Sequence, residues 1–118
     1  MREPVRDKGR LQHMLQAIEC IEKFTEGLTQ EELVSDALHL HAVVYNVQIV
    51  GEAVYRLSKE FKSSHPDTSW ALIEKMRHIL VHDYYRINND VLWMVIKEDL
   101  PPLKEQITRY YDEIKNEN

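Results

Sequence analysis

The chain has 118 residues and a mass of 14.1 kDa, which is enough for a single domain with its own core. It holds only three glycines and four prolines, too few for the frequent turns of an all-β fold. The net charge of −5 excludes a protein that coats nucleic acid through a broad basic surface, but it leaves room for a small local site.

The apolar residues are too dispersed to cross a membrane, since no run approaches about 18 consecutive apolar positions. Met1 is followed by Arg-Glu-Pro-Val-Arg-Asp-Lys, which is not the apolar core of a secretion signal. The single cysteine, Cys20, has no partner for an internal disulfide, and we expect it to be a small core residue. The prediction is a cytoplasmic protein of one domain, residues 1–118.

Apolar residues at helical spacing predict a first helix over residues 5–26, which Gly27 ends. Thr29 and Glu32 have the spacing of a capping box, which marks the start of a second helix. We expect this second helix to continue to Lys62, because the first strong break is the Ser-Ser-His-Pro-Asp stretch that follows.

The middle of this long helix is apolar on nearly all sides. Residues 42–50 include four valines, a composition that a buried strand would share. No turn brackets the run, so we prefer a helix that is buried on more than one face. Gly51 follows the run, and its missing side chain lets another backbone come close.

A third helix is predicted from Trp70, after a cap at Asp67 or Ser69, to an end between His82 and Arg86.

Asn88 or Asn89 caps a fourth helix, which we expect to end at Pro101-Pro102. Its apolar side is formed by Val91, Leu92, Val95 and Ile96. We expect Trp70 and Trp93 to be core residues rather than platforms on which bases stack. Proline also suits the first turn of a helix, so a fifth helix follows. Its apolar positions are Leu103, Ile107, Tyr110 or Tyr111, and Ile114. The chain therefore predicts an all-α bundle of four to five helices.

Arg77 is the anomaly of the third helix. At about 100° per residue it falls in the middle of the apolar arc. The other members of that arc are Trp70, Ile73, Leu80, Val81 and Tyr84. A guanidinium there cannot shed its proton, so it needs an ionic partner or a ligand. A structural pair with an internal carboxylate such as Glu52 and a role in binding are both open.

His82 follows Arg77 by five residues, which is about 140° around a straight helix, so the two cannot share one face. They can meet if the helix ends or bends near His82, or if a second copy of the chain completes the site. This is the one basic, histidine-rich stretch of an acidic chain, and it contains Lys75, Arg77, His78, His82 and Arg86. Taken alone, His82 is more often a structural histidine than a catalytic one.

The segment 77–84 reads Arg-His-Ile-Leu-Val-His-Asp-Tyr and matches the HEPN superfamily motif, in which Arg, a polar residue and three others precede His. Because Tyr84 follows two positions after His82, the chain resembles the HepT toxins, the partners of minimal nucleotidyltransferase (MNT) antitoxins. The segment 46–53, Asn-Val-Gln-Ile-Val-Gly-Glu-Ala, is similar to that family's long-helix signature.

The resemblance covers roughly residues 5–110. Trp70, Met76 and the Leu100-Pro101 pair also occur where the family leads us to expect them. One departure is His78, since close relatives often have Asn there, although the superfamily pattern accepts His.

The resemblance implies an all-α HEPN dimer that cleaves RNA as an endoribonuclease, with no metal or other cofactor. In such cleavage the 2′-hydroxyl of the RNA is the nucleophile. His82 would transfer a proton near neutral pH, since imidazole has an ordinary pKa of about 6.5. Arg77 would hold the phosphate and stabilise its developing charge. His78 or the second copy's His82 would supply the other proton transfer. From the long helix, Glu52 would orient or neutralise Arg77, and a plain structural pair of the two residues is the simpler interpretation.

Tyr84 has two interpretations. Its place in the apolar arc suits a core or interface aromatic. The resemblance instead makes it the residue to which the MNT partner attaches AMP, with Tyr85 as the adjacent alternative. AMPylation would add charge and bulk beside Arg77 and His82 and would block RNA.

Two other functions stay open. One is a non-catalytic HEPN module that binds a nucleotide or substrate for a partner nucleotidyltransferase, and the other is a helical dimer without an active site. The chain contains no metal-ligand spacing, because His39 and His41 differ by two positions and point in different directions on a helix. We expect both of these histidines to be structural or interfacial.

Overall fold

The computed structural model describes residues 6–78 and 88–116, and all the regular elements in these ranges are helical. They are α1 (Asp7–Thr25), α2 (Gln30–Val34), α3 (Ala37–Arg56), α4 (Lys59–Ser64), α5 (Trp70–Glu74), the 3₁₀ turn η1 (Lys75–His78), α6 (Asn89–Met94), the π turn η2 (Val95–Asp99) and α7 (Leu100–Ile114). The predicted all-α bundle is confirmed.

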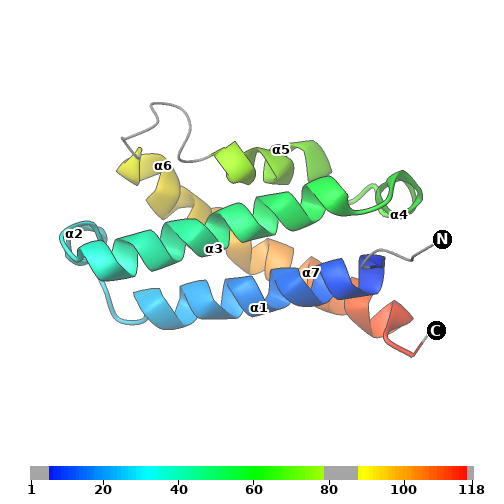
Figure 1. Cartoon of the computed structure of the whole chain (residues 1–118), viewed down its shortest axis with the longest axis horizontal. Helices are drawn as coiled ribbons and strands as arrows, with labels where there is room; N and C mark the ends of the chain where they lie inside the picture. The colour runs from blue at the N-terminus through cyan, green and yellow to red at the C-terminus, as the bar shows by residue number, and fades with distance from the viewer. Residues whose placement is uncertain (1–5, 79–87, 117–118) are drawn as a thin grey trace.

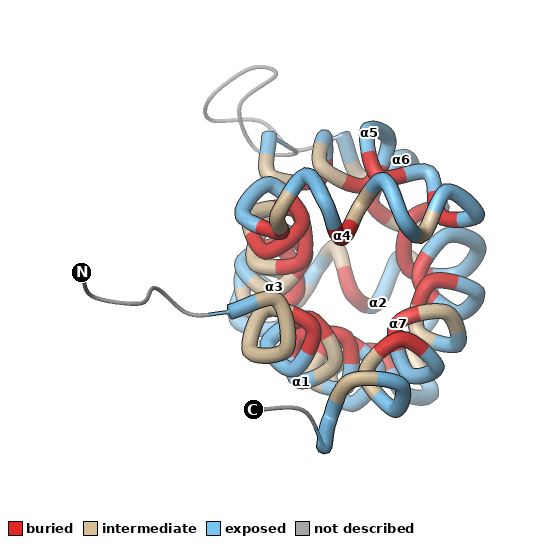
Figure 2. The backbone as a smooth tube through the Cα atoms, turned by 90° about the vertical axis from the view of Figure 1, so that its right-hand side faces the viewer, coloured by how far each residue is buried: buried red, intermediate tan, exposed pale blue. Residues whose placement is uncertain are grey.

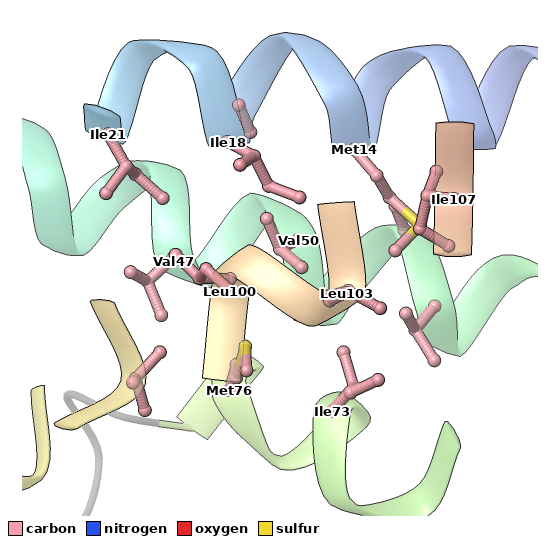
Figure 3. Packing of buried hydrophobic residues seen from close by; sticks show 14 of the residues in the cluster. Met14, Ile18, Ile21, Val47, Val50, Ile73, Met76, Leu100, Leu103 and Ile107 are labelled. Atoms are coloured by element: carbon pink, nitrogen blue, oxygen red, sulfur yellow. The ribbon is translucent and has the colours of Figure 1, made fainter. Parts of the chain in front are cut away.

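The two longest helices, α1 and α3, run antiparallel and form the most extensive helix pair (Figure 1). The helix α7 packs on α1, and α5 with η1 packs on α3. Seen along the long axis, the buried positions face the interior between the helices (Figure 2). Side chains from α1, α3, η1 and α7 meet in this interior (Figure 3).

The first helix follows its predicted pattern closely. Leu11, Met14 and Ile18 are fully buried at a spacing of three and four residues. Gly27 adopts a φ of +76° just after the helix, which is the left-handed conformation that glycine accepts without strain. A hydrogen bond joins α1 to α7: Nζ of Lys104 in α7 donates to Oε1 of Glu22 at 2.8 Å, and this bond raises the pKa of Lys104.

The long helix predicted from Thr29 to Lys62 is wrong, because two caps divide it into α2, α3 and α4. The side chain of Asp36 accepts from the His39 amide at 3.2 Å and starts α3. The side chain of Ser58 accepts from the Phe61 amide at 3.0 Å and starts α4.

A tertiary contact reinforces the second break. The Asp7 carboxylate, at the start of α1, accepts from the backbone amide of Ser58 at 2.8 Å and from its hydroxyl at 2.6 Å. These bonds turn the chain away from α3 and cannot be read from local spacing. The capping box at Thr29 and Glu32 is confirmed as the start of α2.

The apolar run at residues 42–50 is helical and buried, so the preference for helix over strand is confirmed. Its four valines, Val43, Val44, Val47 and Val50, are at most 1% exposed. They are buried on more than one face because α3 lies between α1 on one side and α5 with η1 on the other.

The third predicted helix starts at Trp70, as expected, but it is α-helical only to Glu74. Ser69 takes the N-cap position without a side-chain hydrogen bond. From Lys75 the chain tightens into the 3₁₀ turn η1, so a 100° wheel does not describe Arg77. The predicted end, between His82 and Arg86, lies outside the described residues.

Asn88 caps α6 by accepting from the Val91 amide at 3.1 Å. The prolines do not end a helix: α6 passes through the π turn η2 into α7, whose first turn contains Pro101 and Pro102. Tyr110 rather than Tyr111 is the core residue, at 4% exposed.

Candidate active site

A close backbone contact between α3 and η1 positions Arg77. Gly51 is buried, and a Cβ atom built there would lie 2.9 Å from the carbonyl carbon of Met76 and 3.0 Å from the Cα of Arg77. It would be closer still to the backbone nitrogen of Arg77. The expected role of Gly51, admitting another backbone, is confirmed. Met76 anchors the turn by pointing into the core (Figure 3).

The side chain of Arg77 lies against α3 and is 26% exposed. Its Nε is 3.4 Å from Oε1 of Glu52, and its Nη1 is 3.9 Å from Oε2 of Glu74. The guanidinium carbon lies 3.7 Å from the centre of the Tyr55 ring, which is a cation–π contact. Gln48 also donates to the backbone carbonyl of Arg77 at 3.4 Å.

The predicted pair of Arg77 with Glu52 is therefore present in the structure. Glu52 is shared, because its Oε2 lies 2.9 Å from Nε of Arg56 one turn along α3. Two guanidinium groups thus flank one carboxylate at a partly exposed position. A guanidinium has five N–H donors, so these contacts leave Arg77 with donors for an anion that approaches from solvent.

Three of the predicted site residues lie away from Arg77 or cannot be placed. His78 is exposed and lines a cavity of about 390 Å³ between η1 and α6, together with Lys75, Val91 and Asp99 among others. Arg77 is not among the residues lining this cavity. His82 and Tyr84, with Asp83, Tyr85 and Arg86, lie outside the described residues.

Sequence reasoning missed three residues that contact Arg77, namely Gln48, Tyr55 and Glu74. A signal was present: Gln48, Gly51, Glu52 and Tyr55 follow the i, i+3, i+4, i+7 spacing of one helix face. That face interrupts the apolar surface of α3 with polar and small residues where Arg77 packs.

The other residues singled out from the sequence have structural surroundings. Trp70 is buried as expected, while Trp93 is partly buried and packs at the core's edge. Cys20 is only half-buried, so the expected core position is wrong. His39 forms an ion pair with Asp36 at 2.8 Å if it is protonated.

Within the two described ranges, no group of three or more His, Cys, Asp or Glu side chains is close enough to hold a metal ion. In the same part of the chain, no helix has the length and apolarity needed to cross a membrane.

Comparison with known proteins places this chain in a family. The model of the family described as "Ribonuclease HepT-like" matches residues 14–110. The "Probable ribonuclease HepT" of Thermococcus cleftensis is 37% identical over 97 residues, which are 82% of this chain and 88% of that protein. A search of solved structures found no significant match.

A second relative is longer than this chain. The "Gamma-glutamylcyclotransferase and putative RNase" of Methanocaldococcus jannaschii is 34% identical over 109 residues, or 92% of this chain. The chain spans about half of that protein, since the match covers 49% of it. The family match spans both Gly51 and Arg77, the two residues that define the contact between α3 and η1. The chain belongs to the HepT-like family of ribonucleases, within the HEPN superfamily.

Proposed function

We propose that this protein is a metal-independent endoribonuclease toxin whose activity is centred on Arg77 and His82. The observation that carries the proposal is the packing of Arg77: a buried glycine admits its backbone against α3, and its side chain remains 26% exposed. An arginine held this firmly but open to solvent suits the binding of a phosphodiester. Membership of a ribonuclease family supports RNA as the substrate.

In the proposed reaction, the 2′-oxygen of the RNA attacks the adjacent phosphorus, and the bond from phosphorus to the 5′-oxygen breaks. The products are a 2′,3′-cyclic phosphate and a 5′-hydroxyl. His82 takes the proton of the 2′-hydroxyl or gives one to the leaving 5′-oxygen. His78, or the second copy's His82, carries out the other transfer.

Arg77 stabilises the extra negative charge on the phosphate oxygens as the new bond forms. Glu52 and the Tyr55 ring hold the guanidinium plane in one orientation, so little reorganisation is needed when the phosphate arrives. Glu52 is therefore a positioning residue in this mechanism.

The test is cleavage of RNA by the purified protein in excess EDTA, beside Arg77→Ala and His82→Ala. We expect 2′,3′-cyclic phosphate ends from the wild type and a loss of at least about 100-fold in each variant. Circular dichroism and thermal melting show whether each variant is folded. If folded Arg77→Ala cleaves like the wild type, the proposed centre is wrong.

A second candidate is the non-catalytic module that binds a nucleotide for a partner nucleotidyltransferase. The pairing of Arg77 with both Glu52 and Glu74 favours it, because ion-paired arginines are often structural. This alternative predicts no cleavage by wild-type protein that mass spectrometry shows to be free of AMP.

The proposal includes neutralisation by an MNT partner that AMPylates Tyr84. The phenolate oxygen would attack the α-phosphorus of ATP, forming a tyrosyl-AMP bond and releasing pyrophosphate. The added phosphate would compete with RNA for Arg77. Intact-mass analysis after incubation with the MNT and ATP should show one AMP on the wild type and none on Tyr84→Phe. Addition to Tyr84→Phe would move the site to another residue such as Tyr85.

The proposal also includes a two-fold dimer. Large apolar side chains are exposed on the described surface, at Leu38 (85%), Tyr45 (63%) and Leu72 (65%). Leu38 and Tyr45 are seven positions apart on α3 and therefore lie on one face of that helix, and exposed apolar faces often mark contacts between chains. Light scattering coupled to size-exclusion chromatography should give twice the chain mass, and a monomer at micromolar concentration would contradict the dimer.

A further inference from the structure

A basic groove lies beside Arg77, at the end of the molecule where α1 begins and α3 ends. It has a volume of about 520 Å³ and is lined by Arg10, Tyr55, Arg56, Leu57, Lys59, Lys62 and Glu74. Four of these residues are cationic and one is anionic, whereas the whole chain has a net charge of −5. We propose that this groove binds the single-stranded RNA that flanks the cleaved phosphate, an inference that rests on the proposed function.

The groove is continuous with the candidate active site. Two of its lining residues, Tyr55 and Glu74, are also direct contacts of Arg77, at 3.7 Å and 3.9 Å. A third, Arg56, shares the Glu52 carboxylate with Arg77. A strand with one phosphate at Arg77 therefore has a path over Tyr55 into the groove.

The cations of the groove are available to a polyanion to different extents. Lys59 is exposed at the first position of α4. The Nε atom of Arg10 is buried and has no hydrogen-bond partner among residues 6–78 and 88–116. Arg56 meets Glu52 through Nε, which does not exhaust its five donors. Lys62 is committed in part, because its Nζ donates to the Val54 carbonyl at 3.1 Å.

The ring of Tyr55 selects among the anions that such a groove could take. Tyr55 as a residue is 48% exposed although Arg77 covers part of its ring, and it stands among cationic side chains. Single-stranded nucleic acid is bound by this combination, in which bases stack on aromatic rings while lysine and arginine contact the phosphates. An acidic peptide would use the charges but would gain little from the ring.

The position of Lys59 makes it a clean probe. A cation at the first turn of a helix opposes the helix dipole, so its removal should not destabilise α4. Lys23 is the matched control, because it is exposed near the other end of α1, about 20 Å along the helix from Arg10.

The experiment measures binding of a fluorescein-labelled 2′-O-methyl octanucleotide of mixed sequence, by anisotropy over a range of salt concentrations. This probe lacks the free 2′-hydroxyl and cannot be cleaved by the proposed reaction, so binding is measured separately from activity. The variants are Lys59→Gln, Lys59→Glu, Tyr55→Phe and Tyr55→Leu, beside Lys23→Gln and Lys23→Glu. Thermal melting confirms that each is folded.

We expect Lys59→Gln to reduce the slope of log Kd against log salt by about 0.7, the contribution of one phosphate contact to a single strand. Lys59→Glu should weaken binding further, and the two Lys23 variants should bind like the wild type. Tyr55→Leu should weaken binding by roughly 5-fold to 100-fold, because it loses one stacked base, while Tyr55→Phe should not.

The results separate this inference from the proposed nuclease. If ordinary RNA is cleaved but the Lys59 variants bind the probe like the Lys23 variants, the groove is overturned and the nuclease stands. If binding depends on Lys59 and Tyr55 but no RNA is cleaved, the groove stands without the nuclease. If only charge matters and Tyr55→Leu binds like Tyr55→Phe, the groove takes polyanions in general and its assignment to RNA is overturned. A wild type that does not bind the probe also overturns it.

Discussion

Replacing Gly51 by alanine tests the contact that positions Arg77. The added methyl group would meet backbone atoms of Met76 and Arg77. Because these are backbone atoms, no side-chain rotation can relieve the contact. Overpacking of this kind costs about 1–3 kcal/mol. Alanine also favours a helix over glycine by about 0.5–1 kcal/mol, which opposes this cost. We expect a net loss of about 1–2 kcal/mol in the free energy of unfolding.

The same substitution should affect activity more than stability. To relieve the contact, η1 must move away from α3 and displace the guanidinium of Arg77 from Glu52 and Tyr55. A misplacement of about 1 Å at a catalytic group can cost about 100-fold in rate. We therefore expect kcat/KM for RNA cleavage in EDTA to fall by about that factor.

Urea unfolding followed by circular dichroism measures the stability change. Thr108→Ala, at an exposed position within α7, is the control for helix propensity and should change stability by less than about 0.5 kcal/mol. The sign of the stability change in Gly51→Ala tests whether the contact exists. If Gly51→Ala is more stable than the wild type and cleaves RNA equally well, the close backbone contact does not exist and the reasoning is refuted.

Two further predictions concern the site and the helix break. Arg77→Lys keeps the charge but loses the planar group that meets Glu52 and stacks on Tyr55. Cleavage in EDTA should therefore fall about 100-fold, and wild-type activity in this variant would contradict the role of the guanidinium. Ser58→Ala removes the cap of α4 and the hydrogen bond from the Ser58 hydroxyl to Asp7. Urea unfolding should therefore show a loss of about 1–2 kcal/mol in the free energy of unfolding. Ser64→Ala, at an exposed position of the same helix, is the control and should be nearly neutral. Equal stability of the two serine variants would show that the cap contributes nothing.

The helical class of the chain and most of its core could be predicted from local pattern. The apolar residues of α1 recur at helical spacing, and a strand cannot bury that set on one face. The Val-rich run before Gly51 was ambiguous in period, and the absence of flanking turns was enough to assign it to a helix. These features depend on residues within a turn or two of each other.

The helix boundaries were less predictable, for a physical reason. The break at Ser58 depends on the Asp7 carboxylate, which is 51 residues away in the chain and accepts two hydrogen bonds there. The passage through η2 keeps the chain helical where two prolines favoured a stop. A local pattern states where a helix can end, whereas long-range bonds and packing select among those places.

The candidate site also has features that the sequence predicted and features that only the structure showed. Sequence alone singled out Arg77, because a guanidinium in an apolar arc needs a partner, and it suggested Glu52 and a close approach at Gly51. The structure added Tyr55, Gln48 and the basic groove, because these depend on which face of α3 meets η1 and on how α1, α3 and α4 converge in space. The chemistry of a residue can be read from the sequence, but its contacts with residues of other helices form only when the core packs.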